Sequence, residues 1–258
     1  MRFVFGSMFV TLAILGLSVA LQSLVGFGLG MVAVPLLLWQ GYSLEQSVFL
    51  ALSLSLFSSV IAAAQMRDRL PWRTSARAAA FRVVGVVPGL ALAQATMQLP
   101  TATLKGLIGL VIGVGVVAQA RKMVRPNHLM PEGTAPSRRL APWAFLTSGL
   151  LTGWLGMGGP PLVFWQLTGR PRANQSRGFL FGVYLLTIPF QLALMLAVAP
   201  AQLTPLFPIL LLSAPTCWLV SRSALRWGDR LSGQALSWAS LGFLALLALR
   251  SMADWGLL

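Results

Sequence analysis

The sequence has few charged residues, and acidic residues are the scarcest. Of its 258 residues, 9% are charged and five are Asp or Glu. Soluble domains carry about a quarter charged residues, so this composition excludes an ordinary soluble domain. Cation carriers and proton relays commonly use carboxylates buried in the membrane, so their absence from the apolar segments favours an anionic or neutral ligand. The five acids fall in connections or near segment ends, at Glu45, Asp68, Glu132, Asp229 and Asp254.

Cysteine and histidine are equally scarce, with one residue of each. A single cysteine, Cys217, excludes an intramolecular disulfide. The single histidine, His128, lies in a polar stretch, so no apolar segment offers a His base for a nucleophile or a ligand cluster for a metal. We therefore expect no catalytic residues, no metal site and no cofactor, and we predict that the protein is not an enzyme.

Long apolar segments are what the sequence has in abundance. Hydrophobic residues make up 57% of the chain, and the mean hydropathy is +0.79. A spanning helix needs roughly 20 predominantly apolar residues, and backbone exposed to lipid must be helical to satisfy its hydrogen bonds. We therefore predict an all-α polytopic membrane protein with about 8–10 helices. The expected helices cover residues 3–24, 29–41, 45–65, 78–97, 102–120, 143–155, 158–168, 177–198, 203–221 and 231–250.

The basic residues are unevenly distributed. The net charge is +14, and 15 of the 19 Lys and Arg residues fall in four short connections. Cytoplasmic loops carry an excess of Lys and Arg, so we predict that these connections are cytoplasmic in a bacterial inner membrane. The basic excess thus follows from topology, and we expect no nucleic-acid partner. The four connections lie at 67–77, 121–139, 170–177 and 222–230.

The chain contains an internal repeat. Residues 29–40 read LGMVAVPLLLWQ and residues 155–166 read LGMGGPPLVFWQ, with seven identities in twelve at a constant offset of 126. A Gln-Ser pair follows each copy, at 46–47 and 175–176, and opens a long apolar segment. Internal symmetry of this kind is typical of duplicated transporter folds. Each repeat is predicted to be a broken helical hairpin followed by three transmembrane helices. Repeat one covers 1–120, a basic cytoplasmic linker covers 121–142, and repeat two covers 143–258.

Counting membrane crossings relates the two repeats. With the basic 67–77 connection in the cytoplasm, the 41–45 connection lies outside, because one span separates them. The linker and the 169–177 connection then both lie in the cytoplasm, as their charge requires. The matching connections at 41–45 and 169–177 therefore lie on opposite faces. The two repeats are predicted to have inverted topology, as in many secondary transporters.

Glycine-rich runs interrupt two apolar segments, at 26–30 and 153–161. Glycine lets the chain leave helical dihedrals, and a restarted helix presents free N–H groups and the positive end of its dipole. Such helix ends bind anions, and paired interruptions in matching positions point to a transporter's binding site. Small residues also permit close helix packing without any ligand, and this alternative applies to each run taken alone.

The two runs also carry a family resemblance. GFGLGMVAVPLL (26–37) and GLLTGWLGMGGPPLVF (149–164) resemble the paired signature segments of the sulfite exporter TauE/SafE family, also called the toluene-sulfonate uptake permeases. The resemblance covers both repeats and implies export or uptake of small sulfur oxyanions and organosulfonates, such as sulfite or sulfoacetate. The sequence departs from the family pattern in two places. Residues 30–33 hold fewer consecutive glycines than usual, and residues 160–161 double the proline.

Candidate substrate-binding residues come from the breaks, the repeat and two cations. Gln22 and two Trp-Gln pairs offer amide donors for an oxyanion, although the pairs are alternatively anchors at the membrane edge. Arg82 and Lys105 lie just inside predicted helices, where a long cation either snorkels to the interface or reaches the anion. The full set is Gln22, Gly28, Gly30, Met31, Pro35, Trp39, Gln40, Arg82, Lys105, Gly156, Met157, Gly158, Gly159, Pro160, Trp165 and Gln166.

The predicted function is transport of a small anion by alternating access, with the two breaks meeting at a central site. A serine-rich stretch at 53–59 either lines the path or hydrogen-bonds within its own helix. Two alternatives stay open, a non-transporting membrane scaffold or assembly protein and an anion channel. The expected partners are the anion and the lipid bilayer, and the sequence leaves open a homo-oligomer.

Overall fold

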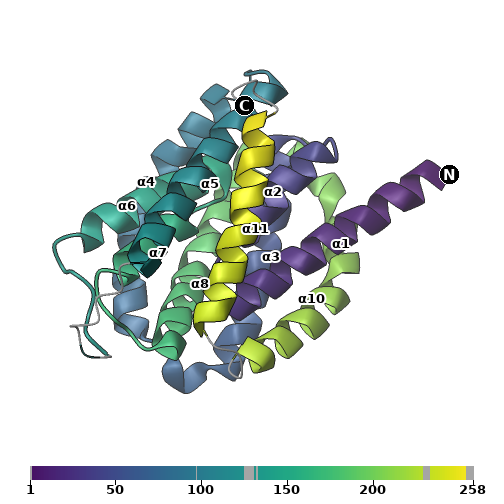
Figure 1. The fold of residues 1–258 in the computed structure, drawn as a ribbon. Helices are drawn as coiled ribbons and strands as arrows, with labels where there is room; N and C mark the ends of the chain where they lie inside the picture. The colour runs from purple at the N-terminus through teal and green to yellow at the C-terminus, as the bar shows by residue number, and fades with distance from the viewer. Residues whose placement is uncertain (1, 97, 125–130, 132, 229–232, 254–258) are drawn as a thin grey trace.

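The structure is a computed structural model, and it describes residues 2–96, 98–124, 131, 133–228 and 233–253. His128 lies outside the described residues. Apart from an isolated bridge between Thr134 and Arg170, regular structure in these ranges is helical. The helices (Figure 1) are α1 (Arg2–Val25), α2 (Leu29–Trp39), α3 (Leu44–Gln65), α4 (Trp72–Thr96), α5 (Thr101–Val124), α6 (Ala141–Leu155), α7 (Gly159–Gln166), α8 (Ala173–Val198), α9 (Pro200–Leu203), α10 (Phe207–Gly228) and α11 (Gly233–Ala253), with 3₁₀ turns η1 (Arg67–Arg69) and η2 (Thr204–Leu206).

Six segments of the described chain are helical, long and apolar enough to cross a membrane, and the prediction of an all-helical multi-pass membrane protein is confirmed. The broken hairpins begin and end within two residues of the predicted positions. The predicted bounds are further from the observed ones where the first or last turns of a helix contain arginines. Helix α4 begins at Trp72 rather than at residue 78, and α10 continues to Gly228 rather than ending at 221. Hydropathy excluded these basic turns, although arginine is a good helix former.

Glycines end the first helix of each hairpin. After α1, Gly26 and Gly28 have left-handed backbone angles, with φ of 92° and 106°. After α6, Gly156 is left-handed with φ of 70°, and the next amide, of Met157, donates to the carbonyl of Leu151. Residues with side chains rarely adopt this conformation, so these glycines determine where the chain turns back.

Each hairpin packs on a helix that is distant from it in sequence, and glycines permit the closest of these contacts. Helix α6 lies along α4, and a Cβ atom on Gly85 would meet the carbonyl oxygen of Leu146. Gly89 and Gly153 make the same close approach one turn further along, where a Cβ on Gly89 would lie 2.9 Å from the Cα of Gly153. Helix α1 packs on α10 at ordinary contact distances. Small residues let membrane helices approach closely, and here they join elements distant in sequence.

The basic connections gather at one end of the helix bundle. The Gly133 amide donates to the Arg170 carbonyl at 2.7 Å, which joins the second part of the linker to the α7–α8 connection. The Ser75 hydroxyl, at the start of α4, donates to the Phe179 carbonyl of α8 at 3.4 Å. The α3–η1 junction and the last turns of α10 meet there too, in a buried cluster of Ala62, Met66, Phe181 and Leu225. Because α3 has 22 residues, its first residue, Leu44, lies at the opposite end.

Candidate functional site

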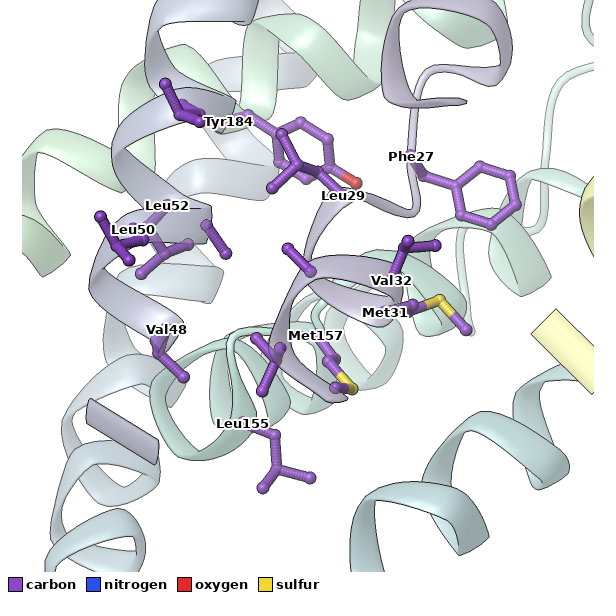
Figure 2. Packing of buried hydrophobic residues seen from close by; sticks show 14 of the residues in the cluster. Phe27, Leu29, Met31, Val32, Val48, Leu50, Leu52, Leu155, Met157 and Tyr184 are labelled. Atoms are coloured by element: carbon purple, nitrogen blue, oxygen red, sulfur yellow. The ribbon is translucent and has the colours of Figure 1, made fainter. Parts of the chain in front are cut away.

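The two glycine breaks meet in the interior of the bundle. A Cβ atom on Gly30 would collide with the Gly156 carbonyl oxygen, so only glycine permits this contact between α2 and the end of α6. Figure 2 shows the buried side chains around the meeting point, among them Met31, Met157 and Tyr184. A cavity of ≈ 20 Å³ lies beside it, and its lining includes Gln22, Gly28, Gly30, Ser55, Arg82, Thr152, Gly158, Gly159 and Tyr184.

Arg82 is the central cation of this cavity. It is the eleventh residue of the 25-residue helix α4, which at 1.5 Å per residue places it about 15 Å from the helix start. It is five residues past Arg77, the last residue of the basic connection, which is about 7.5 Å further along the helix. The side chain is 2% exposed and therefore does not snorkel to an interface. The sequence analysis placed Arg82 near the helix end because it predicted a helix start at residue 78, whereas α4 starts at Trp72.

Two threonines and a tyrosine hold the guanidinium in place. Its Nη1 donates to the Thr187 hydroxyl at 3.1 Å, and its Nη2 donates to the Thr152 hydroxyl at 2.6 Å. Each hydroxyl gives its own proton to a helix carbonyl, of Val183 or Ser148, and so presents lone pairs to the arginine. The guanidinium carbon lies 5.0 Å from the centre of the Tyr184 ring, within cation–π range.

The positive charge of Arg82 has no counter-ion among the described residues. Both of its donated bonds go to neutral hydroxyls, and its Nε–H has no hydrogen-bond partner there. A guanidinium has five N–H donors, so three remain available. An uncompensated buried charge costs several kcal/mol, whereas an anion in the adjacent cavity would neutralise it. The geometry therefore suits a bound oxyanion.

Helix starts add backbone donors to the same cavity. Helix α2 starts after Gly28 without a side-chain cap, and its first internal bond runs from the Val32 amide to the Gly28 carbonyl at 3.1 Å. The amides of residues 29–31 precede that bond and have no partner within the helix. Helix α7 also starts uncapped, after Gly158. Its next residues are Pro160 and Pro161, which lack N–H groups, so α2 offers more donors than α7.

The structure brings some of the predicted site residues together and leaves others apart. Nine line the cavity, namely Gln22, Gly28, Gly30, Met31, Arg82, Gly156, Met157, Gly158 and Gly159. The other seven do not line it, namely Pro35, Trp39, Gln40, Lys105, Pro160, Trp165 and Gln166.

The second Trp-Gln pair makes structural contacts at the basic end. The Trp165 indole donates to the Ser137 carbonyl at 2.8 Å and packs on Phe145 and Phe179. The Gln166 amide donates to the Ser176 carbonyl at 3.0 Å and accepts from the Ser176 hydroxyl. These bonds attach the linker and the start of α8 to the end of α7.

The sequence reasoning missed three residues around Arg82, namely Thr152 and Tyr184, which line the cavity, and Thr187, which bonds to the guanidinium. Each is a polar side chain within a long, mostly apolar run. Polar residues in such runs usually face the protein interior, and this was the available signal. Tyr184 and Thr187 are three residues apart on α8 and so share one face, toward Arg82. No group of three or more His, Cys, Asp or Glu side chains among the described residues could hold a metal ion.

Comparison with known proteins identifies the family of this chain. The family model for the sulfite exporter TauE/SafE matches residues 10–251. A curated relative from Cupriavidus necator, described as a probable sulfite/organosulfonate exporter TauE, is 30% identical over 157 residues. That match covers 59% of this chain and 57% of the relative, so the chain spans little more than half the relative's length. No solved structure matches the chain. The resemblance read from the glycine-rich runs is confirmed, and the chain belongs to the sulfite exporter TauE/SafE family.

Proposed function

We propose that this protein carries a small sulfur oxyanion, sulfite or an organosulfonate, across a bacterial inner membrane, and that the central cavity binds it. One observation supports this most strongly. The Arg82 guanidinium is 2% exposed, lacks an acidic partner among the described residues, and faces a cavity beside an uncapped helix start. The family and the printed name of the relative support the sulfur chemistry.

The donor set suits a tetrahedral or pyramidal oxyanion. The guanidinium fork offers parallel N–H groups for two oxygens, and such charge-assisted bonds are roughly twice as strong as neutral ones. The first amides of α2 and the positive end of its dipole serve a third oxygen. The Gln22 amide also lines the cavity. The protein thus supplies one positive charge and several neutral donors, which binds an anion without holding it permanently.

Inverted repeats are part of the proposal, and the positions of the two hairpins support it. The Thr11 hydroxyl of α1 lies 3.3 Å from the Tyr42 hydroxyl of the α2–α3 connection, at the end away from the basic connections. The α6–α7 hairpin ends at Gln166, beside Ser176 at the basic end. The hairpins therefore enter from opposite ends, as inverted repeats over 1–120 and 143–258 require, with the linker at 121–142.

Helix pairing supports the same symmetry. Helices α3 and α8 hold matching places in the two repeats and pack on each other, as do α5 and α11. Helix α4 packs on α6 as α10 packs on α1. These paired contacts are the ones expected if a two-fold axis relates the repeats. The basic end faces the cytoplasm in this arrangement, since cytoplasmic connections carry the Lys and Arg excess.

Transport then requires the cavity to open. A volume of ≈ 20 Å³ is enough for one or two water molecules and is too small for a hydrated oxyanion. We propose that the repeats rock against each other, so that the cavity opens to each face in turn. A site with so little free volume favours a carrier over an anion channel.

Flux measurements on the purified protein in liposomes test this function. We expect saturable uptake of labelled sulfite or sulfoacetate, accelerated by unlabelled anion on the opposite side, because a carrier exchanges bound substrate. Flux that increases linearly with concentration and shows no counterflow would indicate a channel. A protein that moves none of the oxyanions tested, although correctly folded, would be a scaffold, and the proposal would be wrong.

A further inference from the structure

A second cavity lies beyond the central one. Its volume is ≈ 40 Å³, and its lining comes mainly from α3, α4, α6 and α8, four of the helices that line the central cavity. Glu45, near the start of α3, and Val198, at the end of α8, are among its lining residues. Both belong to the end of the bundle away from the basic connections. The second cavity therefore lies between the central site and the opposite membrane face.

One face of α8 runs from the first cavity to the second. Tyr184 and Ile188 line the central cavity, and Met195 and Val198 line the second. These residues recur at spacings of three, four or seven, so they form a single stripe along the helix. Gln191 is the stripe position between the two cavities, and it is 1% exposed.

Helix α4 shows the same sequence of positions. Arg82 lines the central cavity, Leu90 and Ala93 line the second, and the fully buried Val86 lies between them. On α6, neighbouring residues line different cavities, because Thr152 lines the central cavity and Gly153 lines the second. One layer of side chains therefore separates the two spaces.

The separating layer is bonded directly to the anion site. The Gln191 side-chain amide donates to the Thr152 carbonyl oxygen at 2.8 Å. The hydroxyl of the same threonine accepts from Arg82 at 2.6 Å. A movement of Gln191 away from Thr152 therefore loosens the layer and the guanidinium support together.

We propose that the second cavity is the outer half of the anion pathway and that Gln191 and Val86 close it. This inference rests on the proposed function. When the cavity opens outward, the Gln191 amide leaves the Thr152 carbonyl and donates instead to the passing anion. An amide serves this purpose because it has two N–H donors and no charge to trap the anion. The outward route is thus a continuation of the Arg82 site along α8.

Site-directed labelling tests the position of the pathway. In a Cys217→Ala background, which removes the single cysteine, Ala93→Cys places a thiol in the second cavity, and Val84→Cys places one on the 63% exposed, outward-facing side of the same helix. We expect a membrane-impermeant thiol reagent, added outside intact cells, to modify Ala93→Cys about tenfold faster than Val84→Cys. Reaction requires a thiolate accessible from water, and the outward-facing side of the helix faces lipid. Modification should block transport by Ala93→Cys only, and sulfite in excess should slow it.

A second variant tests the closing layer. Gln191→Leu keeps the size of the side chain but removes its donor, and we expect its maximal transport rate to fall about tenfold while sulfite still stabilises the protein against heat. Equal losses of rate and of sulfite binding would place Gln191 in the binding site and overturn the gating role. Labelling of Ala93→Cys from the cytoplasmic side only, in protein that still transports, would overturn the outward route. Both outcomes leave the proposed function intact, since that function fails only if the wild-type protein moves no oxyanion.

Discussion

Replacing Arg82 with methionine separates a ligand-binding role from a packing role, because the two roles predict opposite effects on stability. Without an anion, the change removes an uncompensated buried charge that costs several kcal/mol. It also removes two hydrogen bonds worth about 1 kcal/mol each. The Thr152 and Thr187 hydroxyls keep their helix carbonyl partners, so neither becomes an unpaired donor. We expect the free energy of unfolding to rise or to stay within about 1 kcal/mol of wild type.

With an anion, the same variant loses affinity. Two bonds from the guanidinium fork to the oxyanion are worth about 1.5–3 kcal/mol each, or about 3–6 kcal/mol together. Since 1.4 kcal/mol is a tenfold change, the dissociation constant should rise by at least about a hundredfold. Arg82→Lys should lie between the two, because a lysine keeps the charge and loses the planar fork.

Thermal unfolding in detergent with increasing sulfite or sulfoacetate measures both effects. An anion at a hundred times its dissociation constant stabilises the protein by about 2.7 kcal/mol, and this stabilisation should disappear in Arg82→Met. Arg77→Met, an exposed position on the same helix, is the matched control and should keep it. If Arg82→Met unfolds several kcal/mol more easily and still responds to the anion, the arginine supports packing and the reasoning is refuted.

Three further substitutions test the surroundings of the site. Gly30→Ala drives a Cβ into the Gly156 carbonyl oxygen and should destabilise the fold by about 1–3 kcal/mol. Its control, Gly242→Ala, has open space around it and should stabilise α11 by up to about 1 kcal/mol. Equal effects of the two changes in thermal unfolding would contradict the close contact. Gln166→Leu should lower the free energy of unfolding by about 1–3 kcal/mol without changing the KM for anion transport. A raised KM would indicate that the Trp-Gln pair contributes to anion binding. Glu45→Gln removes from the second cavity a negative charge that repels the anion, and it should speed anion entry from outside about twofold at low salt. An unchanged rate at every salt concentration would argue against entry past this residue.

Local backbone chemistry made the hairpins predictable. Gly26, Gly28 and Gly156 adopt left-handed angles that other residues avoid, so the glycine-rich runs indicated the breaks correctly. The repeat was a less accurate guide at the level of single turns. Leu29 begins α2, whereas its counterpart Leu155 ends α6, so the break falls after the shared Leu in one repeat and before it in the other.

The composition of the site was only partly predictable, because tertiary contacts decide which polar residues meet. Arg82 was recognised as a candidate, but its depth depended on the start of α4, which the basic first turns hid from hydropathy. Trp165 and Gln166 recur in both repeats, yet in repeat two they attach α7 to the linker and to α8. Tyr184 and Thr187 contact Arg82 only because α8 packs on α4, and no local sequence pattern predicts that packing.

The most direct test of an anion site between the breaks is a crystal structure with selenite, a heavier analogue of sulfite whose selenium is located by anomalous scattering. The expected result is a single strong peak in the central cavity, within hydrogen-bond distance of the Arg82 guanidinium and of the first amides of α2. The peak should be absent from Arg82→Met crystals grown in the same way. A peak elsewhere in the membrane region, with the central cavity empty in a protein that transports selenite, would contradict the assignment.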